Sequence, residues 1–480
     1  MALCLALVLT AGSGEKASGA SGGLSVPAVG MTKQGRVERL GGVTGVAYAV
    51  AVDGSTAYVG SSDGLYAINV SNPANPQVAN YFATPAPVTG VALAGGKAYV
   101  TWGTSGYGGM SVVNLGTFLG VATVGPASVP ALDVVVSGSY AYVALGGTDL
   151  ESGNWLAEVD VINISGATPQ VLGYYLTEGW PHRLALAKNR VFVALERYDA
   201  WDDFYYGAVE LINATTPTAP IYAGEVNYIE GGVTDISIPN SEFAYVGWYQ
   251  YEGGGGAKGA AGSAPDAPPS PKGKAALYYG GVDVLNISNI ADVQRMDTSY
   301  ADGGLDALHA NNDYLYALWA SSDTDGGLIV ADIKSDPVYP DMLGYYDTFN
   351  VGYDVVAAGG LIFAANGTNG LEIFRYSPPE PPVADFYAEP LSGPAPLTVR
   401  FYDTSEPGGE PIHTWDWDFG DGGTSSLQNP THVYTVPGDY DVTLYVETDV
   451  DGSVVTLEQY IHVTAGGEGE GEGEGEGEGE

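Results

Sequence analysis

The stretch GLYAINVSNPANPQVANY, residues 64–81, shows the pattern that recurs through most of the chain. A strand-like apolar run ends in Asn, a Pro-containing link follows, and a second strand-like run begins. A strand reading AYV, centred on Tyr58, precedes it. Sustained 3.6-residue apolar spacing is absent from the sequence, and short runs bounded by Gly, Asn, Asp and Ser dominate. The pattern predicts an all-β protein.

The aromatic residue of the AYV strand marks a repeat. It recurs at spacings of 41, 43, 50, 53, 71 and 47 residues, at Tyr58, Tyr99, Tyr142, Phe192, Tyr245, Tyr316 and Phe363. A base period of about 42 residues matches four short strands per unit, which is the size of a propeller blade. Seven copies predict a seven-bladed β-propeller over residues 35–377. We expect the strand-like piece at 35–40 to complete the last blade and close the ring.

The repeated units resemble LVIVD repeats, a family of bacterial propeller repeats. Residues 64–81 carry the resemblance best, and GLIVADIKSDPVYPDMLGYYDT at 327–348 is the next clearest. The second unit, with NLGTFLGV at 114–121, and the fifth unit, with an insertion at 252–276, depart from the pattern. The resemblance implies the propeller architecture and little about activity.

Residues 383–465 have a different character and follow a Pro-rich linker at 378–382. Apolar and polar residues alternate, and HTWDWDFGDG at 413–422 is followed by HVY and PGDYDV motifs. This region resembles a PKD domain, a β-sandwich of immunoglobulin type. We expect Trp415, Trp417 and Phe419, which lie two residues apart, to face the core. The resemblance implies an extracellular spacer or a non-catalytic module that binds protein or polysaccharide.

Charge excludes two classes of partner. The 480 residues include 16 Lys and Arg against 57 Asp and Glu, for a formal charge of −41. This balance argues against nucleic-acid binding and against a polybasic membrane-surface binder. Residues 382–465 contain 14 acidic residues and one base, Arg400, and residues 466–480 form a Gly-Glu tail that we expect to be disordered. Such a surface favours divalent cations over polyanions as partners.

The N-terminal segment, residues 1–23, resembles a secretory signal. Its apolar run at 2–11 is too short to span a bilayer, and an apolar tail without a targeting role is the alternative. The single cysteine, Cys4, lies in this segment, so a disulfide framework is excluded. The sequence therefore predicts an exported monomer that is secreted, periplasmic or at the cell surface, with no transmembrane segment.

Polar residues on the first strand of several units form the first candidate site, because that strand lines the channel of a propeller. Counting back nine or ten residues from the aromatic marker identifies Asp133, Arg183, Asp235, Asp306 and Asp354, with His182 and His309 nearby. In one interpretation these residues bond to strand ends and neighbouring blades. In the other they bind a polar ligand at the channel mouth, and the four aspartates suit Ca²⁺, the one cofactor that the sequence suggests.

A second candidate is the loop ERYDAWDDFYYG at 196–207. Its aromatic residues, Trp201, Phe204, Tyr205 and Tyr206, are suited to stacking on sugar rings, or alternatively pack on a neighbouring blade. Catalytic motifs with a nucleophile are absent, so no catalytic residue is assigned. The sequence favours a non-catalytic binding or scaffold protein for an extracellular protein or polysaccharide. The alternative is a propeller hydrolase or lyase acting at the channel mouth.

Five N-glycosylation sequons are present, and four of them share one place in the repeat, after the third strand. Their asparagines are Asn69, Asn163, Asn213 and Asn286, and the fifth is Asn366. Asn followed two residues later by Ser or Thr caps a turn through side-chain bonds to the backbone. We expect the repeated sequons to be turn caps, with glycosylation as the alternative.

Overall fold

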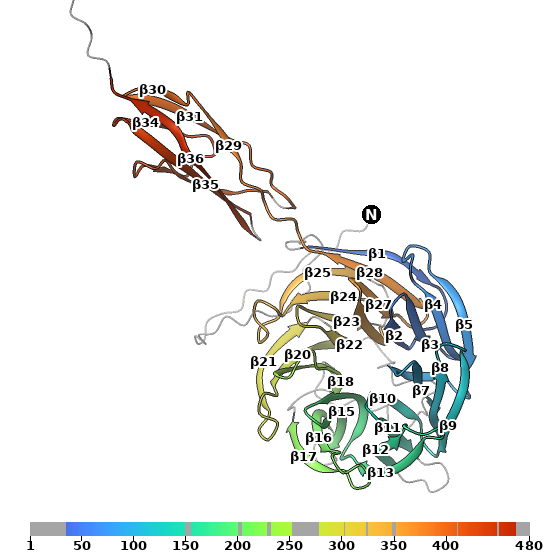
Figure 1. Cartoon of the computed structure of the whole chain (residues 1–480). Coiled ribbons are helices and arrows are strands. Elements are labelled where there is room, and N and C mark those ends of the chain that lie inside the picture. Colours follow the sequence, from blue (N-terminus) through green and yellow to red (C-terminus); the bar gives the residue numbers. More distant parts are fainter. Residues whose placement is uncertain are drawn as a thin grey trace, which may run out of the picture.

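The computed structural model describes residues 35–148, 155–199, 204–227, 232–251, 278–301, 303–322, 325–347, 352–409, 411–448 and 451–466. The regular elements of these residues are all strands, in seven four-stranded sheets and a two-sheet sandwich (Figure 1). The predicted fold class, a seven-bladed propeller followed by an immunoglobulin-like sandwich, is confirmed. The signal-like segment at 1–23, the insertion at 252–276 and the Gly-Glu repeat at 467–480 lie outside the described residues.

Six blades are each formed by four consecutive strands, with the innermost strand first. Blades 1 to 3 contain β2 (Ala49–Asp53), β3 (Thr56–Gly60), β4 (Gly64–Asn69), β5 (Gln77–Ala83), β6 (Val88–Ala94), β7 (Lys97–Thr104), β8 (Tyr107–Asn114), β9 (Leu119–Ala127), β10 (Ala131–Ser137), β11 (Tyr140–Thr148), β12 (Trp155–Asn163) and β13 (Gln170–Leu176). Blades 4 to 6 contain β14 (Trp180–Ala187), β15 (Arg190–Asp199), β16 (Phe204–Asn213), β17 (Ile221–Asn227), β18 (Gly232–Ser237), β19 (Phe243–Tyr251), β20 (Tyr278–Asn286), β21 (Gln294–Ala301), β22 (Gly304–Ala310), β23 (Tyr314–Ser322), β24 (Asp325–Asp332) and β25 (Asp341–Asp347).

Blade 7 joins the two ends of the propeller chain. Its inner strands are β26 (Asp354–Ala358), β27 (Leu361–Ala365) and β28 (Leu371–Ser377), and its outer strand is β1 (Arg36–Val43). Strand β1 pairs antiparallel with β28, with Val37 opposite Tyr376. The predicted closure is therefore confirmed, and backbone hydrogen bonds hold the ring shut.

The apolar core of the propeller lies between the blades. Each pair of adjacent blades encloses one cluster of buried side chains, including the pair formed by blades 7 and 1. At that closing interface Phe363 of blade 7 packs with Val50 and Val59 of blade 1. The marker aromatics belong to these clusters, and Phe192 and Tyr245 are fully buried. Burial of one such side chain contributes about 1.5–3 kcal/mol, so the repeat is maintained by contacts between blades.

The repeated asparagines form turns. The side-chain oxygens of Asn69, Asn163, Asn213 and Asn286 each accept the backbone N–H two residues later, at 2.9–3.1 Å. The turn-cap interpretation is confirmed at these four sites. Asn366 differs, because its side-chain amide donates to Glu372 at 2.5 Å.

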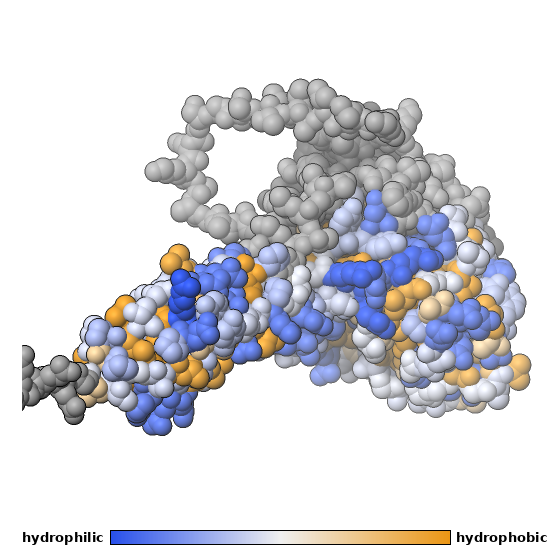
Figure 2. Space-filling view, turned by 90° about the horizontal axis from the view of Figure 1, so that it is seen from above, coloured by the Kyte–Doolittle hydropathy of each residue, from blue (hydrophilic) through white to orange (hydrophobic). Residues whose placement is uncertain are grey.

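The sandwich consists of a three-stranded and a five-stranded sheet. The strands are β29 (Phe386–Glu389), β30 (Ser392–Pro394), β31 (Leu397–Asp403), β32 (Thr414–Asp418), β33 (Thr424–Ser425), β34 (Thr431–Tyr434), β35 (Gly438–Glu447) and β36 (Gly452–Thr464). Hydrophobic and hydrophilic residues are mixed over the coloured part of the face shown in Figure 2.

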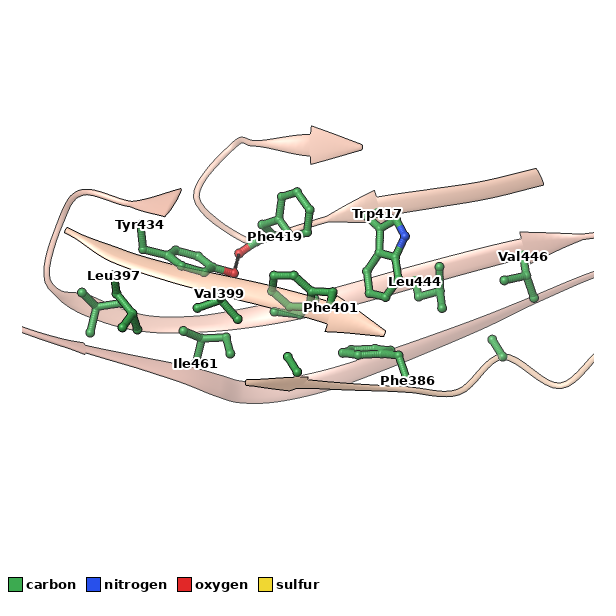
Figure 3. Close-up of a cluster of buried hydrophobic side chains, with 14 residues drawn as sticks. Phe386, Leu397, Val399, Phe401, Trp417, Phe419, Tyr434, Leu444, Val446 and Ile461 are labelled. Atoms are coloured by element: carbon green, nitrogen blue, oxygen red, sulfur yellow. Dashed lines mark hydrogen bonds between the residues drawn. The ribbon is translucent and has the colours of Figure 1, made fainter. Parts of the chain in front are cut away.

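The sandwich core is built around Trp417 (Figure 3). The centroid of its ring lies 5.1 Å from that of the Phe386 ring and 5.5 Å from that of the Phe401 ring. Phe419 is also buried, and the Tyr434 hydroxyl donates to its carbonyl at 3.1 Å. Trp415 departs from the expected pattern because it is only partly buried. Its indole N–H donates to Asp403 Oδ2 at 2.8 Å, at the edge of the core.

Candidate functional site

Strand register decides which residues of the first candidate site are equivalent. A β-bulge interrupts the inner strand of blades 2 to 6, and the residue after it pairs with the second residue beyond the marker aromatic. The equivalent positions in blades 1 to 7 are Ala49, Gly90, Asp133, Arg183, Asp235, Ala307 and Asp354. The structure therefore brings four of the candidates into one ring of positions around the channel.

The three aspartates at this position each join their blade to the next. Asp133 Oδ2 accepts the Leu184 N–H of blade 4 at 2.8 Å. Asp235 accepts the Leu308 N–H of blade 6 at 2.8 Å, and Asp354 accepts the Val50 N–H of blade 1 at 2.8 Å. These carboxylates satisfy backbone donors near the start of neighbouring inner strands, and in blades 4 and 6 the donor lies just after the bulge.

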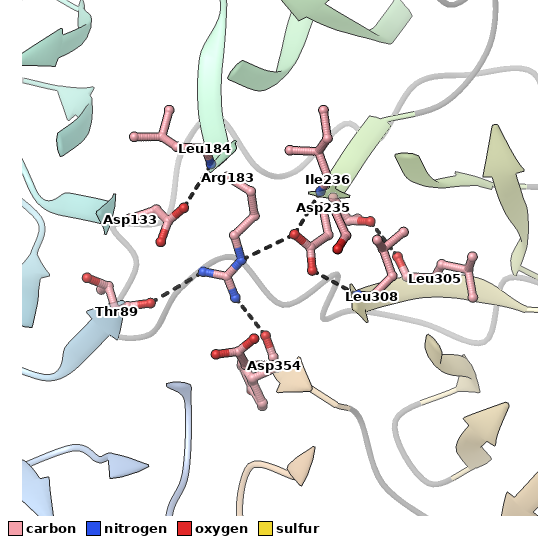
Figure 4. A network of polar contacts seen from close by, with 12 residues as sticks. Thr89, Asp133, Arg183, Leu184, Asp235, Ile236, Leu305, Leu308 and Asp354 are labelled. Atoms are coloured by element: carbon pink, nitrogen blue, oxygen red, sulfur yellow. Dashed lines mark hydrogen bonds and ion pairs between the residues drawn. The ribbon is translucent and has the colours of Figure 1, made fainter. Parts of the chain in front are cut away.

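Arg183 reaches from blade 4 across the channel (Figure 4). Its guanidinium donates to the backbone carbonyl of Tyr353 in blade 7 at 2.7 Å and to that of Thr89 in blade 2 at 3.4 Å. Its Nε lies 3.9 Å from Asp235 Oδ1 in blade 5. One side chain thus contacts three other blades, and its planar fork of donors suits this task. We call Arg183 with Asp133, Asp235 and Asp354 the channel hub.

Burial dominates the electrostatics of the channel hub. It raises the pKa of Asp133 to about 6 and that of Asp235 to about 7, although the Arg183 cation opposes both shifts. Burial likewise raises the pKa of Asp354, again against the effect of Arg183. For Arg183 itself, burial disfavours the charge, but Asp354, Asp133 and Asp235 outweigh it and raise the pKa. The guanidinium therefore stays charged among carboxyls whose pKa values are all raised, two of them to about 6 and about 7.

Asp306 does not share the register of the channel hub. It lies in the bulge of blade 6, one residue before the equivalent position, which Ala307 occupies. Burial raises its pKa well above the usual value, with the Gly352 amide hydrogen-bonded to it in opposition. Its Oδ2 has no hydrogen-bond partner among the described residues. Counting ten residues back works for Asp235 because the turn of blade 5 is longer, and fails for Asp306.

The two histidines lie apart from each other. His182 occupies the bulge of blade 4, and its Nε2 is 3.8 Å from Glu196 Oε2. His309 pairs with Tyr316 on the neighbouring strand, and burial lowers its pKa to about 4. Among the described residues, neither histidine forms a hydrogen bond or an ion pair with the carboxylates of the channel hub.

The aspartates are not gathered as a calcium site. Three of them surround a guanidinium and bond to separate backbone amides, and Asp306 is displaced by one register position. Within the part of the chain that the structure describes, no three His, Cys, Asp or Glu side chains are grouped to hold a metal ion. The geometry of the channel hub is that of an internal polar brace.

The aromatic loop of blade 4 is described only in part. Trp201 lies outside the described residues, and Phe204 and Tyr205 are described by their backbone, at the start of β16. Tyr206 pairs with Arg197 on β15 and is partly exposed. A glycan-binding role for these four residues stays a prediction.

Sequence reasoning missed a second repeated polar position, in the middle of the third strand. Ser111, Asp160, Glu210, Asp283 and Glu372 each pair with the residue that follows the marker aromatic. Asp283 is fully buried and accepts from Trp248, Arg295 and Thr298, and its Oδ2 lies 2.6 Å from Arg295 Nε. The sequence feature that could have indicated this position is a charged residue inside an apolar strand, as in VDVL or VELI. A charge that is buried in such a strand needs a hydrogen-bonding or charged partner.

Sequence reasoning also missed a tryptophan pair between blades 3 and 4. The rings of Trp155 and Trp180 lie 5.1 Å apart at an interplanar angle of 62°. Trp155 is 57% exposed, whereas Trp180 packs against the apolar cluster between the two blades. Each tryptophan is the first residue of its strand. An aromatic residue at the start of a predicted strand was therefore the feature of the sequence that could have indicated this pair.

Family models match both regions of the chain. The LVIVD repeat model matches residues 44–84, 130–151 and 309–348, and the PKD domain model matches residues 379–464. The chain thus carries LVIVD repeats and a C-terminal PKD domain, as the sequence motifs predicted. A microbial collagenase from Vibrio alginolyticus is 37% identical over 71 residues, which is 15% of this chain and 8% of that protein.

Several solved structures resemble the chain at 10–13% identity. A computationally designed protein, Ika8, covers 70% of this chain with 98% of its own length, at a TM-score of 0.45. BamB from Moraxella catarrhalis covers 71% of this chain with 98% of its own length, at a TM-score of 0.43. The β-propeller domain of Cps50 (Swd1) from Myceliophteria thermophila covers 71% with 99% of its length, at 0.49.

Across the described ranges, the structure contains no helix with the length and apolarity needed to cross a bilayer.

Proposed function

We propose that this protein has a non-catalytic binding or scaffold role outside the cytoplasm, with a protein or a polysaccharide as its partner. The LVIVD repeats and the C-terminal PKD domain that the chain carries support this role. The observation that carries the proposal is the channel hub. Arg183 and three carboxylates occupy the place where many propellers bind ligands, and each of them is engaged in joining blades. The outer surfaces are then what remains for recognition.

The hydrolase or lyase alternative has less support. A general acid or base must lie within hydrogen-bond reach of a substrate proton. Both oxygens of Asp235 accept backbone N–H groups, from Ile236 at 2.7 Å and from Leu308 at 2.8 Å. A substrate would have to displace these bonds and open the interface between blades 5 and 6. The pKa values near neutrality follow from burial and do not require a catalytic role.

Secretion or cell-surface display is part of the proposal. The signal-like segment at 1–23 and the PKD domain support it. The formal charge of −41 favours solubility and supports a weak association with cations such as Ca²⁺ at the surface. It also counts against nucleic acid as the partner.

Turnover measurements with the full-length protein test the proposal. Purified protein is incubated with soluble polysaccharides and with lactones, and product formation is followed for the wild type and for Asp235→Asn. We expect no turnover by either protein, while immobilised glycans or surface proteins retain the wild type. Turnover by the wild type that Asp235→Asn abolishes would establish the enzyme alternative instead.

A further inference from the structure

The five described tryptophans of the propeller lie at one end of the ring. This is the end where the second and third strands of each blade are connected, and where each first strand begins. Trp102, Trp248 and Trp319 are near the ends of β7, β19 and β23. Trp155 and Trp180 begin β12 and β14. We call this end of blades 3 to 5 the aromatic rim.

Three of the tryptophans belong to the core. Trp102, Trp248 and Trp319 are buried and pair with glycines on the next strand: Gly109, Gly281 and Gly327. A Cβ atom at Gly109 would lie 2.7 Å from Cζ2 of Trp102, and one at Gly281 would lie 2.9 Å from Cζ2 of Trp248. A backbone carbonyl lies nearer still, Val124 O at 2.6 Å from the first and Ser299 O at 2.1 Å from the second. The glycines therefore admit both the close neighbouring strand and the indole ring, and core packing accounts for the burial of these tryptophans.

Trp155 lacks such an explanation. It projects from the same face of β12 as Val159 and Val161, which pack against blade 4, but it lies beyond them at the strand start. The Trp180 ring supports one side of it, and 57% of Trp155 stays exposed. Aromatic rings that are fixed in place and left in water are typical of recognition sites, because binding recovers the cost of their exposure.

The rim position of Trp155 is aromatic in three consecutive blades. Trp155 pairs with Thr148 six residues beyond the marker of blade 3. By the same count, Tyr205 pairs with Tyr198 in blade 4, and Tyr278 pairs with Tyr251 in blade 5. The backbone register therefore places a row of aromatic residues along an arc, with the Trp155–Trp180 pair at one end.

We propose that the aromatic rim binds a linear neutral polysaccharide, with Trp155 stacking on the C–H face of one sugar ring. The exposed face of Trp155, held in place by the Trp180 ring, suits the C–H face of a sugar ring, and the backbone register repeats an aromatic residue at this strand position in the next two blades. The charge of −41 and the exposed Glu178, just ahead of Trp180, disfavour an acidic polymer. This inference rests on the proposed binding function and names its ligand class and site.

The test is native affinity electrophoresis of the full-length protein in gels containing mannan, xylan, laminarin or dextran, with alginate as the acidic comparison. We expect at least one neutral polysaccharide to retard the protein. Trp155→Ala should weaken that retardation by about tenfold in association constant, and Trp155→Phe should preserve most of it. Tyr174→Ala is the matched control, since Tyr174 is 58% exposed on the outer strand of the same blade.

Each outcome has a defined meaning. Because Trp155 is largely exposed, Trp155→Ala should unfold at the wild-type temperature, which thermal unfolding verifies. Equal retardation of Trp155→Ala and Tyr174→Ala, stronger retardation by alginate, or none by any neutral polysaccharide would overturn the inference. If a protein partner, or a glycan that ignores Trp155, still binds the chain, the proposed function survives and only this site assignment fails.

Discussion

The centre of the propeller is polar, whereas the centre of the sandwich is apolar. In the sandwich, Trp417 fills the space between two sheets with help from Phe386 and Phe401. In the propeller the apolar layers lie between blades, and at the ring axis Arg183 meets Asp235 and the backbone of blades 2 and 7. Two face-to-face sheets leave a closed apolar layer, but inner strands that converge around an axis bring unpaired backbone groups together.

This difference predicts how each region responds to damage. A large side chain removed from the sandwich leaves a cavity in a single core, so the loss should be large and confined to that domain. A residue removed from the channel hub loosens contacts among several blades and leaves charges whose protonation depends on pH. Mutations in the two centres therefore separate the two modes of stabilisation.

The largest effect is expected for Trp417→Ala. Loss of a buried tryptophan from the sandwich core should cost about 3–5 kcal/mol. Differential scanning calorimetry of the full chain should show the sandwich transition moving to a lower temperature while the propeller transition stays. Leu427→Ala, at a side chain that is 66% exposed, is the control and should change little. If both transitions moved together, the two centres would not be independent.

Arg183→Met tests the channel hub. Removing the guanidinium leaves Asp133, Asp235 and Asp354 without their shared cation, and we expect a loss of about 3 kcal/mol in the free energy of propeller unfolding at pH 8. The loss should shrink at pH 5, where Asp133 and Asp235 are protonated because burial raises their pKa to about 6 and about 7. Urea unfolding at both pH values measures it, with the exposed Arg36→Met as the control. An equal loss at both pH values would show that Arg183 acts by packing alone.

Asp235→Asn isolates one titrating group. The pKa of Asp235 is raised to about 7 in the folded protein, so between about pH 4 and pH 7 the folded state binds more protons than the unfolded state. Its contribution is therefore full below about pH 4 and is lost as pH rises through 7. Between pH 4.5 and pH 7.5 the free energy of unfolding of the wild type should fall by on the order of 3 kcal/mol, and that of the variant should not show this fall. Parallel pH profiles of urea unfolding would contradict this.

The smallest effect is expected for Ser111→Ala. The Ser111 hydroxyl accepts the indole N–H of Trp102 at 3.0 Å, and its loss leaves a buried donor unpaired. A cost of about 1–2 kcal/mol follows. Blade 6 provides a natural comparison, because Ile329 occupies the same position there and the Trp319 Nε1 has no partner among the described residues. Calorimetry that showed no shift of the propeller transition would mean that this bond is dispensable.

Much of the fold could be predicted because the repeat is written into local patterns. The marker aromatics, the Asn turns and the strand at 35–40 each specify their own element, and the structure places all of them as expected. The candidate site was predicted less well. Counting residues placed Asp133, Arg183 and Asp354 in one register, but could not show that the shorter turn of blade 6 leaves Asp306 in the bulge, one residue before the equivalent position.

The sequence by itself determined the number of blades, the ring closure and the sandwich, because alternation, turn residues and repeat length act over a few residues. Tertiary structure alone decided what the polar residues do. Arg183 could become a brace across the channel only when blades 2, 5 and 7 were brought within reach of one side chain. The exposed Trp155 likewise became recognisable only beside Trp180, because contacts between blades depend on the closed ring and leave no mark in local sequence.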